Sequence, residues 1–251
     1  MDYKLLLDTA VMAGEIMLES GAETYRVEDT MHRMLSLSQL KTSQVFVTVT
    51  GFVATLDDPS IHSMTVVRRI NSRGTNLDKI HQINSISRRL CGGQLTLEDA
   101  FHQIRDIKRR PPTPQACLLS TTVVTAAFTM TFGGTFWEIL IAALAGFLMA
   151  VCLYICKRFH VQSFLSTLLS AAAVSVCAFL CTRILSMPGS LDPIVIGSIM
   201  PLVPGVAITN AVFDTLNGDY LSGVARTMEA FVTAAAVAIG IGIGLGLLQR
   251  I

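Results

Sequence analysis

The feature that most constrains the fold is a series of long apolar segments in the part of the chain after Pro111. The hydrocarbon core of a bilayer is about 30 Å thick, and roughly 20 helical residues are needed to cross it. Segments of about that length lie at residues 115–132, 136–156, 164–183, 194–213 and 221–248. The sequence therefore predicts an α-helical membrane protein with five transmembrane helices, surrounded by a lipid bilayer.

The residues before Pro111 have a different composition. Only 15% of the 251 residues are charged, compared with about 25% in soluble domains, and most of these charges fall in residues 1–110. Apolar residues at helical spacing flank two segments of alternating β-branched and aromatic residues, at 43–56 and 61–70, which predicts the order ααββαα. We therefore expect a small cytosolic α+β domain at 1–110 and a transmembrane domain at 111–251.

Positively charged loops predict the orientation of the chain. Lys and Arg are enriched in cytoplasmic loops. Here they precede the first span and separate the second from the third, at Arg105, Lys108, Arg109, Arg110, Lys157 and Arg158. Both loops lie on the cytoplasmic side only if the N-terminus is cytoplasmic, and five spans then place the C-terminus outside. The net charge of +1 gives no indication of nucleic-acid binding.

The fourth predicted span is interrupted by Pro201, Pro204 and Gly205. Proline removes a backbone donor and breaks a helix, and a broken helix at membrane depth lines a cavity or packs inside protein. The half-helix after the break would direct its free N–H groups and positive dipole end toward the middle of the membrane, where they suit a substrate carboxylate. A simple proline kink in a packed helix is the alternative.

Polar side chains follow this break. Asn210 and Asp214 are four residues apart and share one helix face. Asp214 would bind a proton, a cation or a substrate amine, or would lie solvated at the membrane interface. On the fifth span, Arg226 and Glu229 would form a buried ion pair, or Arg226 would contact Asp214 or an anionic substrate. Spacing alone leaves these alternatives open.

The cytosolic part contains the motif GAETYRVE at residues 21–28, with Gly21, Glu23, Arg26 and Glu28. Its acidic and basic side chains would suit hydrolysis or gating, but their spacing favours a corner between two helices with surface ion pairs, which contribute little energy. The cysteines and histidines lack zinc spacing, and no Ser-His-Asp arrangement is recognisable. We therefore expect no metal, no cofactor and no catalytic residue.

Two motifs, GAETYRVE at 21–28 and PLVPGVAITNAVFDTLNGDYLSGVARTMEA at 201–230, resemble the threonine/serine exporter family (ThrE) in this order and over nearly the whole chain. The full family pattern adds a second five-span unit, which we do not expect in this chain. The chain is thus similar to the split form, a YjjP-like subunit whose expected partner is a small YjjB-like membrane protein. The family pattern highlights Gly21, Glu23, Arg26, Glu28, Pro201, Pro204, Gly205, Asn210, Asp214, Gly218, Asp219, Arg226 and Glu229.

The resemblance implies export of small metabolites: threonine and serine, or a dicarboxylate such as succinate. We therefore expect a non-enzymatic subunit of a secondary exporter, multi-pass in a bacterial plasma membrane, in a homo- or hetero-oligomer. A carboxylate would bind at the half-helix after Pro204, Asn210 would orient it, and Asp214, Arg226 and Glu229 would couple charge to transport. The alternatives are a membrane-anchored hydrolase and a regulatory subunit that acts through the cytosolic domain.

Overall fold

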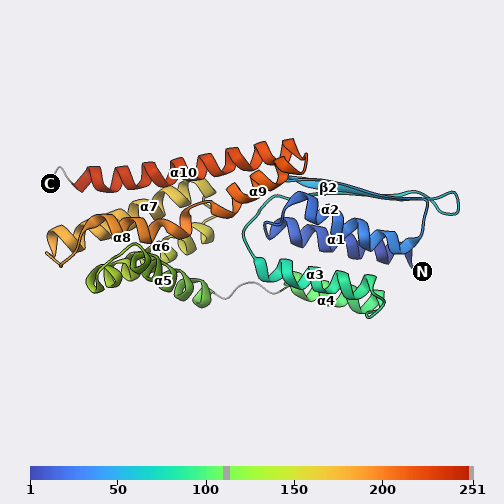
Figure 1. Cartoon of the computed structure of the whole chain (residues 1–251), viewed down its shortest axis with the longest axis horizontal. Coiled ribbons are helices and arrows are strands. Elements are labelled where there is room, and N and C mark those ends of the chain that lie inside the picture. Colours follow the sequence, from blue (N-terminus) through green and yellow to red (C-terminus); the bar gives the residue numbers. More distant parts are fainter. Residues whose placement is uncertain (110–113, 249–251) are drawn as a thin grey trace. The chain divides into compact units, whose positions relative to one another are not determined.

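The structure is a computed structural model that describes residues 1–109 and 114–248. It divides into two compact units (Figure 1). The first combines residues 1–111 with 205–228, and the second combines 112–204 with 229–251. Arg110 and the domain boundary predicted beside it lie outside the described residues.

The first unit contains a small antiparallel sheet and the helices packed around it. Its elements are α1 (Tyr3–Glu19), α2 (Thr24–Leu35), a 3-10 turn (Ser36–Ser38), β1 (Thr42–Thr48), β2 (Gly51–Asp57), β3 (Met64–Arg69), α3 (Leu77–Cys91), α4 (Leu97–Arg109), α9 (Gly205–Leu216) and the beginning of α10 (Tyr220–Leu248). Residues 205–228, which hydropathy assigns to membrane spans, thus belong to the same compact unit as the N-terminal domain.

The sheet has three strands in the order β1-β2-β3, so the predicted two-stranded order ααββαα is wrong. The segment predicted as one strand at 43–56 turns back at Val49 and Thr50, and β1 pairs with β2 so that Thr48 faces Gly51. The Thr48 hydroxyl donates to the Gly51 carbonyl at 3.0 Å and supports this turn. Since β-branched residues favour strands and this turn carries no Asn-Gly signal, the sequence pattern did not reveal it.

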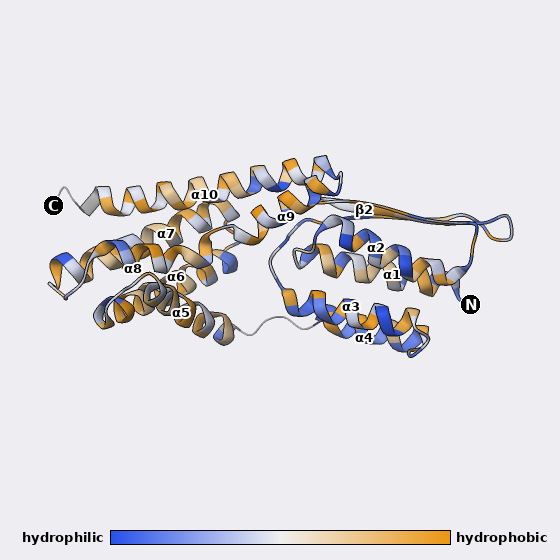
Figure 2. Ribbon diagram, in the orientation of Figure 1, coloured by the Kyte–Doolittle hydropathy of each residue, from blue (hydrophilic) through white to orange (hydrophobic). Residues whose placement is uncertain are grey.

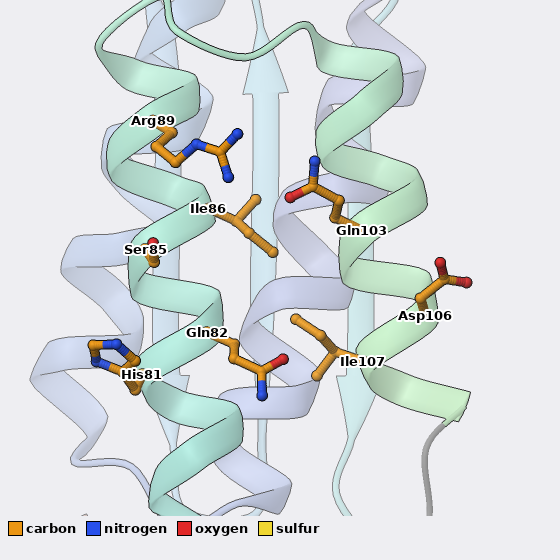
Figure 3. A pocket seen from close by; sticks show the side chains of 8 residues that line it. All are labelled: His81, Gln82, Ser85, Ile86, Arg89, Gln103, Asp106 and Ile107. Carbon is orange, nitrogen blue, oxygen red and sulfur yellow. The ribbon is translucent and has the colours of Figure 1, made fainter.

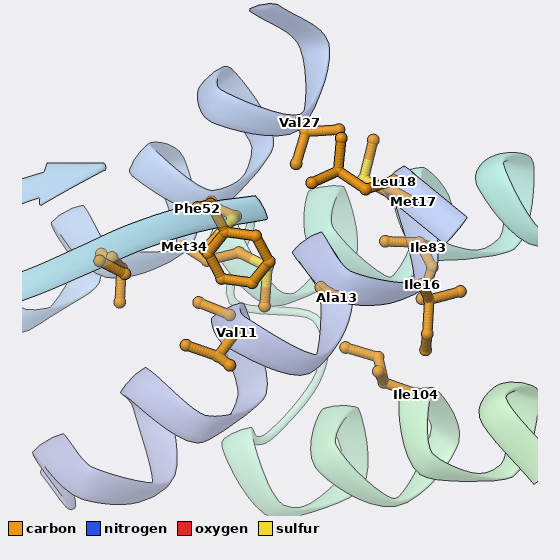
Figure 4. Close-up of a cluster of buried hydrophobic side chains, with 14 of the residues drawn as sticks. Val11, Ala13, Ile16, Met17, Leu18, Val27, Met34, Phe52, Ile83 and Ile104 are labelled. Carbon is orange, nitrogen blue, oxygen red and sulfur yellow. The ribbon is translucent and has the colours of Figure 1, made fainter. Parts of the chain in front are cut away.

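Alternation along the strands determines which face of the sheet is buried. Val47, Phe52, Ala54 and Leu56 point to one face and are almost fully buried, as expected for a period of two residues. They join a core that α1, α2, α3 and α4 complete (Figure 4). The predicted helical spacing in α1 is confirmed, because Leu7, Val11, Gly14 and Leu18 are all buried. This core anchors the corner between α1 and α2.

The second unit is made of apolar helices (Figure 2). They are α5 (Pro114–Thr131), α6 (Phe136–Arg158), α7 (Ser163–Phe179) with a π-helical turn (Leu180–Ile184), α8 (Leu191–Ile199) with a 3-10 turn (Met200–Leu202), and the remainder of α10. Among the described residues, three helices are long and apolar enough to span a membrane, at 136–158, 163–184 and 220–246. The pair 191–202 and 205–216 would add a fourth if it forms one span, and the helix at 115–131 is apolar but shorter. The chain is thus a mostly helical, multi-pass membrane protein, and length does not establish five spans.

Buried polar groups in the second unit are used for helix capping and packing. Glu138 is 5% exposed and accepts hydrogen bonds from the backbone N–H of Thr135 and of Ser190, each at 2.6 Å. One carboxylate thereby caps α6 and ties it to the residue that precedes α8. All six cysteines are free thiols, and Cys156, Cys177 and Cys181 are buried.

Candidate functional site

The corner between α1 and α2 has a backbone conformation that depends on glycine. Gly21 has φ +83°, and a Cβ there would lie 2.7 Å from the Gly74 carbonyl oxygen. The Gly74 N–H donates to the Glu19 carbonyl at 2.9 Å, which fixes the end of α1 to the loop before α3. Because left-handed φ values favour glycine, the first motif begins with Gly21, and the chain reverses there before α2 starts at Thr24.

The carbonyl oxygens of this corner receive hydrogen bonds from the second motif. The Asn210 side-chain amide on α9 donates to the Gly21 carbonyl at 2.8 Å. The Arg226 guanidinium on α10 donates to the Ala22 carbonyl at 2.6 Å. Asn210 and Arg226 are each 5% exposed, so both bonds are shielded from water. Residues about 190 to 204 positions apart in sequence are thereby held together.

Asp214 completes the arrangement from the buried side of α9. Its Oδ1 accepts hydrogen bonds from the Thr24 backbone N–H at 3.0 Å and from the Thr24 hydroxyl at 2.7 Å. Its Oδ2 lies 2.8 Å from Arg226 Nε, and the two side chains are 0% and 6% exposed. We call Gly21, Ala22, Thr24, Asn210, Asp214 and Arg226 the motif clamp. It holds the hairpin of α9 and the first turns of α10 against the α1–α2 corner.

The energetics of the motif clamp follow from the burial of its charges. Removing a carboxylate and a guanidinium from water is expensive, and only close pairing with further hydrogen bonds compensates. Asp214 has both, because Thr24 supplies two donors and Arg226 supplies the countercharge. Of the alternatives that the sequence left open, the contact of Arg226 with Asp214 is present in the structure.

A cavity of about 400 Å³ lies beside the motif clamp, and its walls are mainly polar. It is lined by Tyr25, Glu28, Asp29, His32, Val45, Asn217 and Asp219. Burial raises the pKa of Glu28 above its ordinary value, a backbone hydrogen bond from Val47 acts in the opposite direction, and the charge of Asp219 raises it further. Asp219 Oδ2 also lies 3.2 Å from the Thr24 hydroxyl, which is closer to Asp214. The cavity is thus connected to the clamp through one shared hydroxyl.

The remaining predicted residues lie outside the clamp. Glu23 and Arg26 form an ion pair at 3.5 Å, with side chains 18% and 43% exposed, as predicted for a helix corner. The predicted break is present: Pro201 lies in a 3-10 turn, and α9 begins at Gly205. Glu229 lies on the exposed surface of α10, in the part of that helix that belongs to the second unit. Pro201 and Pro204 also belong to the second unit.

A second hollow, of about 370 Å³, lies between α3 and α4. Figure 3 shows Ile86 and Ile107 between the two helices, with Arg89 and Gln103 above them in this view, whereas the Asp106 side chain points away from α3. None of the predicted site residues lines this hollow. Among the residues that the structure describes, no group of three or more His, Cys, Asp or Glu side chains could hold a metal ion.

Sequence reasoning missed Thr24 and Ala22. The charged side chains of the first motif lie outside the clamp, and the motif contributes mainly backbone groups: two carbonyl oxygens and one N–H. The available signal was the presence of a hydroxyl residue, Thr24, between the charged residues of the motif. A buried carboxylate commonly requires such donors.

Comparison with known proteins places this geometry in a family. Residues 8–248 match the model of a family described as "Putative threonine/serine exporter". A "Probable threonine/serine exporter" of Mycobacterium tuberculosis is 25% identical over 244 residues, which cover 92% of this chain and 44% of that protein. "Pheromone-regulated membrane protein 10" of Eremothecium gossypii is 24% identical over 220 residues, 84% of this chain and 29% of that protein. No solved structure matches.

The chain therefore spans less than half the length of either relative. The family match, in contrast, includes both motifs and nearly all of the described helices. The chain therefore belongs to the threonine/serine exporter family.

Proposed function

We propose that the chain is a subunit of a secondary exporter that moves small carboxylate metabolites out of the cell. The substrates would be threonine and serine, or a dicarboxylate such as succinate. Family membership and the apolar helices support this proposal. As the resemblance to the split form implies, we propose that a small YjjB-like membrane protein is its partner, in a bacterial plasma membrane with the N-terminus of this chain in the cytoplasm.

The observation that carries the proposal is the placement of the motif clamp on α10. This helix is continuous from Tyr220 to Leu248. Its first turns hold Arg226 in the clamp, and its later turns pack among the apolar helices of the second unit. A change in the clamp would therefore act directly on a helix that contributes to the membrane part. We assign the clamp the role of coupling the cytosolic domain to transport.

The substrate carboxylate is proposed to bind at the beginning of α9. A Cβ on Gly205 would meet no atom within 4 Å, and Val206 is exposed, so an anion can approach the first N–H groups of the helix. Asn210 bonds the Gly21 carbonyl in this conformation. For Asn210 to orient the substrate, that bond would have to open. We propose that Asp214 and Arg226 act through the clamp instead.

An efflux assay tests this function. Cells that express the chain with its proposed partner are loaded with threonine, serine or succinate, and efflux is followed for Asp214→Asn and Arg226→Ala at matched expression. Both variants should lose most of the efflux. Arg33→Ala is the matched control, because Arg33 pairs with Asp29 at 2.9 Å in an exposed position and should transport normally. Unchanged efflux in both clamp variants would show that the clamp does not couple the cytosolic domain to transport.

One observation favours the alternative of a hydrolytic cytosolic domain. The cavity of about 400 Å³ contains Glu28, whose raised pKa suits general acid–base chemistry. This alternative requires that the purified full chain turn over a substrate without a membrane gradient, and that Glu28→Gln abolish the turnover. Efflux that persists in Glu28→Gln would separate the two functions.

A further inference from the structure

A cavity in the second unit is lined by residues that have no role in the proposed export function. It lies between α5 and α6, has a volume of about 570 Å³, and falls in the range of about 300–1,000 Å³ that is typical of small-molecule sites. Its walls are mainly apolar, with Leu118 on α5 and Leu153 on α6 among the lining residues. The cavity is therefore suited to a ligand with a hydrocarbon part.

One end of this cavity is positively charged. Lys157 and Arg158, in the last turn of α6, line it together with His160, and no carboxylate does. Lys157, Arg158 and His160 are exposed, and within the described residues none of them forms an ion pair. Cys117, in the first turn of α5, also lines the cavity, so the positive end of that helix dipole lies nearby. An anionic group is the complementary partner.

The position of the cavity relative to the membrane surface indicates which anion it would hold. Tyr154 lines it one turn before Arg158 and is 51% exposed. Tyrosine and basic residues at the end of an apolar helix mark the headgroup level of a bilayer. The C-terminal dipole of α6 and the positive-inside rule are enough to explain why Lys157 and Arg158 are basic. They do not account for an apolar cavity that ends at those side chains.

We infer that this cavity is a binding site for an anionic phospholipid. The phosphate lies against Lys157, Arg158 and His160, and the part of an acyl chain next to the headgroup lies between α5 and α6. Basic pockets between transmembrane helices commonly recognise acidic headgroups. The site lies on the side of the membrane that the sequence predicts to be cytoplasmic. It is independent of the motif clamp.

The site is tested by native mass spectrometry on the purified full chain in mild detergent, with phosphatidylglycerol and phosphatidylcholine as probes. We expect phosphatidylglycerol to be retained and phosphatidylcholine to be lost. Each basic residue near an anionic surface contributes about fivefold in affinity, so K157Q/R158Q should weaken phosphatidylglycerol binding roughly 30-fold. R88Q/R105Q is the control for total charge, because it also removes two charges, and Arg88 on α3 and Arg105 on α4 are exposed and away from the cavity lining.

A second variant separates the cavity from its charges. Thr121→Trp fills the space between the helices and leaves Lys157 and Arg158 in place. The variant therefore has the same charge as the original chain, and the charges that direct membrane insertion and orientation are unchanged. It should also release phosphatidylglycerol, with helix content by circular dichroism as the check on folding. Equal retention of the two lipids, an equal loss in R88Q/R105Q, or full retention in a folded Thr121→Trp would overturn the inference. Displacement by millimolar glycerol phosphate would identify a soluble anion as the ligand and overturn the lipid assignment.

Discussion

Replacing Arg226 with methionine should open the motif clamp far more than replacing an exposed arginine. The side chain keeps a similar length but loses its charge, and it leaves the Asp214 carboxylate, 0% exposed, with only the two donors of Thr24. Removing one partner of a buried ion pair costs about 3–5 kcal/mol. At 1.36 kcal/mol per factor of ten, the opening equilibrium of the hairpin should rise between about 150- and 5,000-fold.

Amide hydrogen exchange in the full chain measures this opening. The Thr24 N–H donates to Asp214, so the peptide that contains Thr24 reports directly on the clamp, and peptides from 205–228 report on the hairpin. Arg33→Met is the control, because the exposed pair of Arg33 with Asp29 has side chains 66% and 54% exposed. Exposed pairs contribute about 0–1 kcal/mol, so exchange should rise by roughly fivefold or less.

A double variant tests the electrostatic reasoning. Asp214→Asn keeps an acceptor for Thr24 but leaves Arg226 buried without its countercharge. Combining Asp214→Asn with Arg226→Met removes both charges, so the double variant should be more stable than the sum of the single effects predicts. Equal amide exchange in Arg226→Met and Arg33→Met, or additive effects in the double variant, would refute the claim that the buried ion pair stabilises the clamp.

Three further substitutions have either a matched control or an expected direction of change. Gly21→Ala should lower the thermal midpoint by several degrees more than Gly93→Ala: both have positive φ, but only at Gly21 would the new Cβ meet a backbone oxygen, whereas at Gly93 it meets open space. Gly240→Ala should weaken helix packing, because its Cβ would meet a backbone oxygen of α7, whereas Gly242→Ala meets no atom and should be neutral or slightly stabilising; heating in detergent compares them. The pKa of Glu28 is raised above 4.5 mainly by burial, so the folded state holds its proton more tightly, and this group's contribution to stability is lost as pH rises from about 4.5 through the folded pKa. Glu28→Gln should flatten the pH dependence of the thermal midpoint in that window.

Much of the helical framework could be predicted from the sequence, because its signals are local. The apolar segments and the helix break at Pro201–Gly205 are present at the predicted positions. On α10, Gly240 and Gly244 face α7, whereas Gly242 faces open space. The sequence did not reveal that α9 belongs to the same compact unit as the N-terminal helices, because hydropathy measures composition and not which unit a helix packs with.

The partners of the polar residues could not be predicted, because they are not local. The Oδ1 atom of Asp214 accepts hydrogen bonds from a hydroxyl and a backbone N–H that lie 190 positions away in sequence. Two of the clamp's acceptors are backbone carbonyls, which every residue possesses and which no sequence pattern identifies. The turn at Val49 and Thr50 was missed for a related reason, since those residue types favour strands.

The motif clamp explains why two distant motifs occur together. The corner at Gly21 leaves carbonyl oxygens without partners inside its own helices, and the α9–α10 hairpin buries an amide and a guanidinium that need acceptors. Each motif therefore satisfies polar groups of the other, and a change in either leaves buried polar groups without partners. Since Asp214 and Arg226 pair with each other, we propose that a substrate or a proton binds at the border of the clamp, at Asp219, Glu28 or the first turn of α9. A transport cycle that acts through this joint should change the exposure of those three elements first.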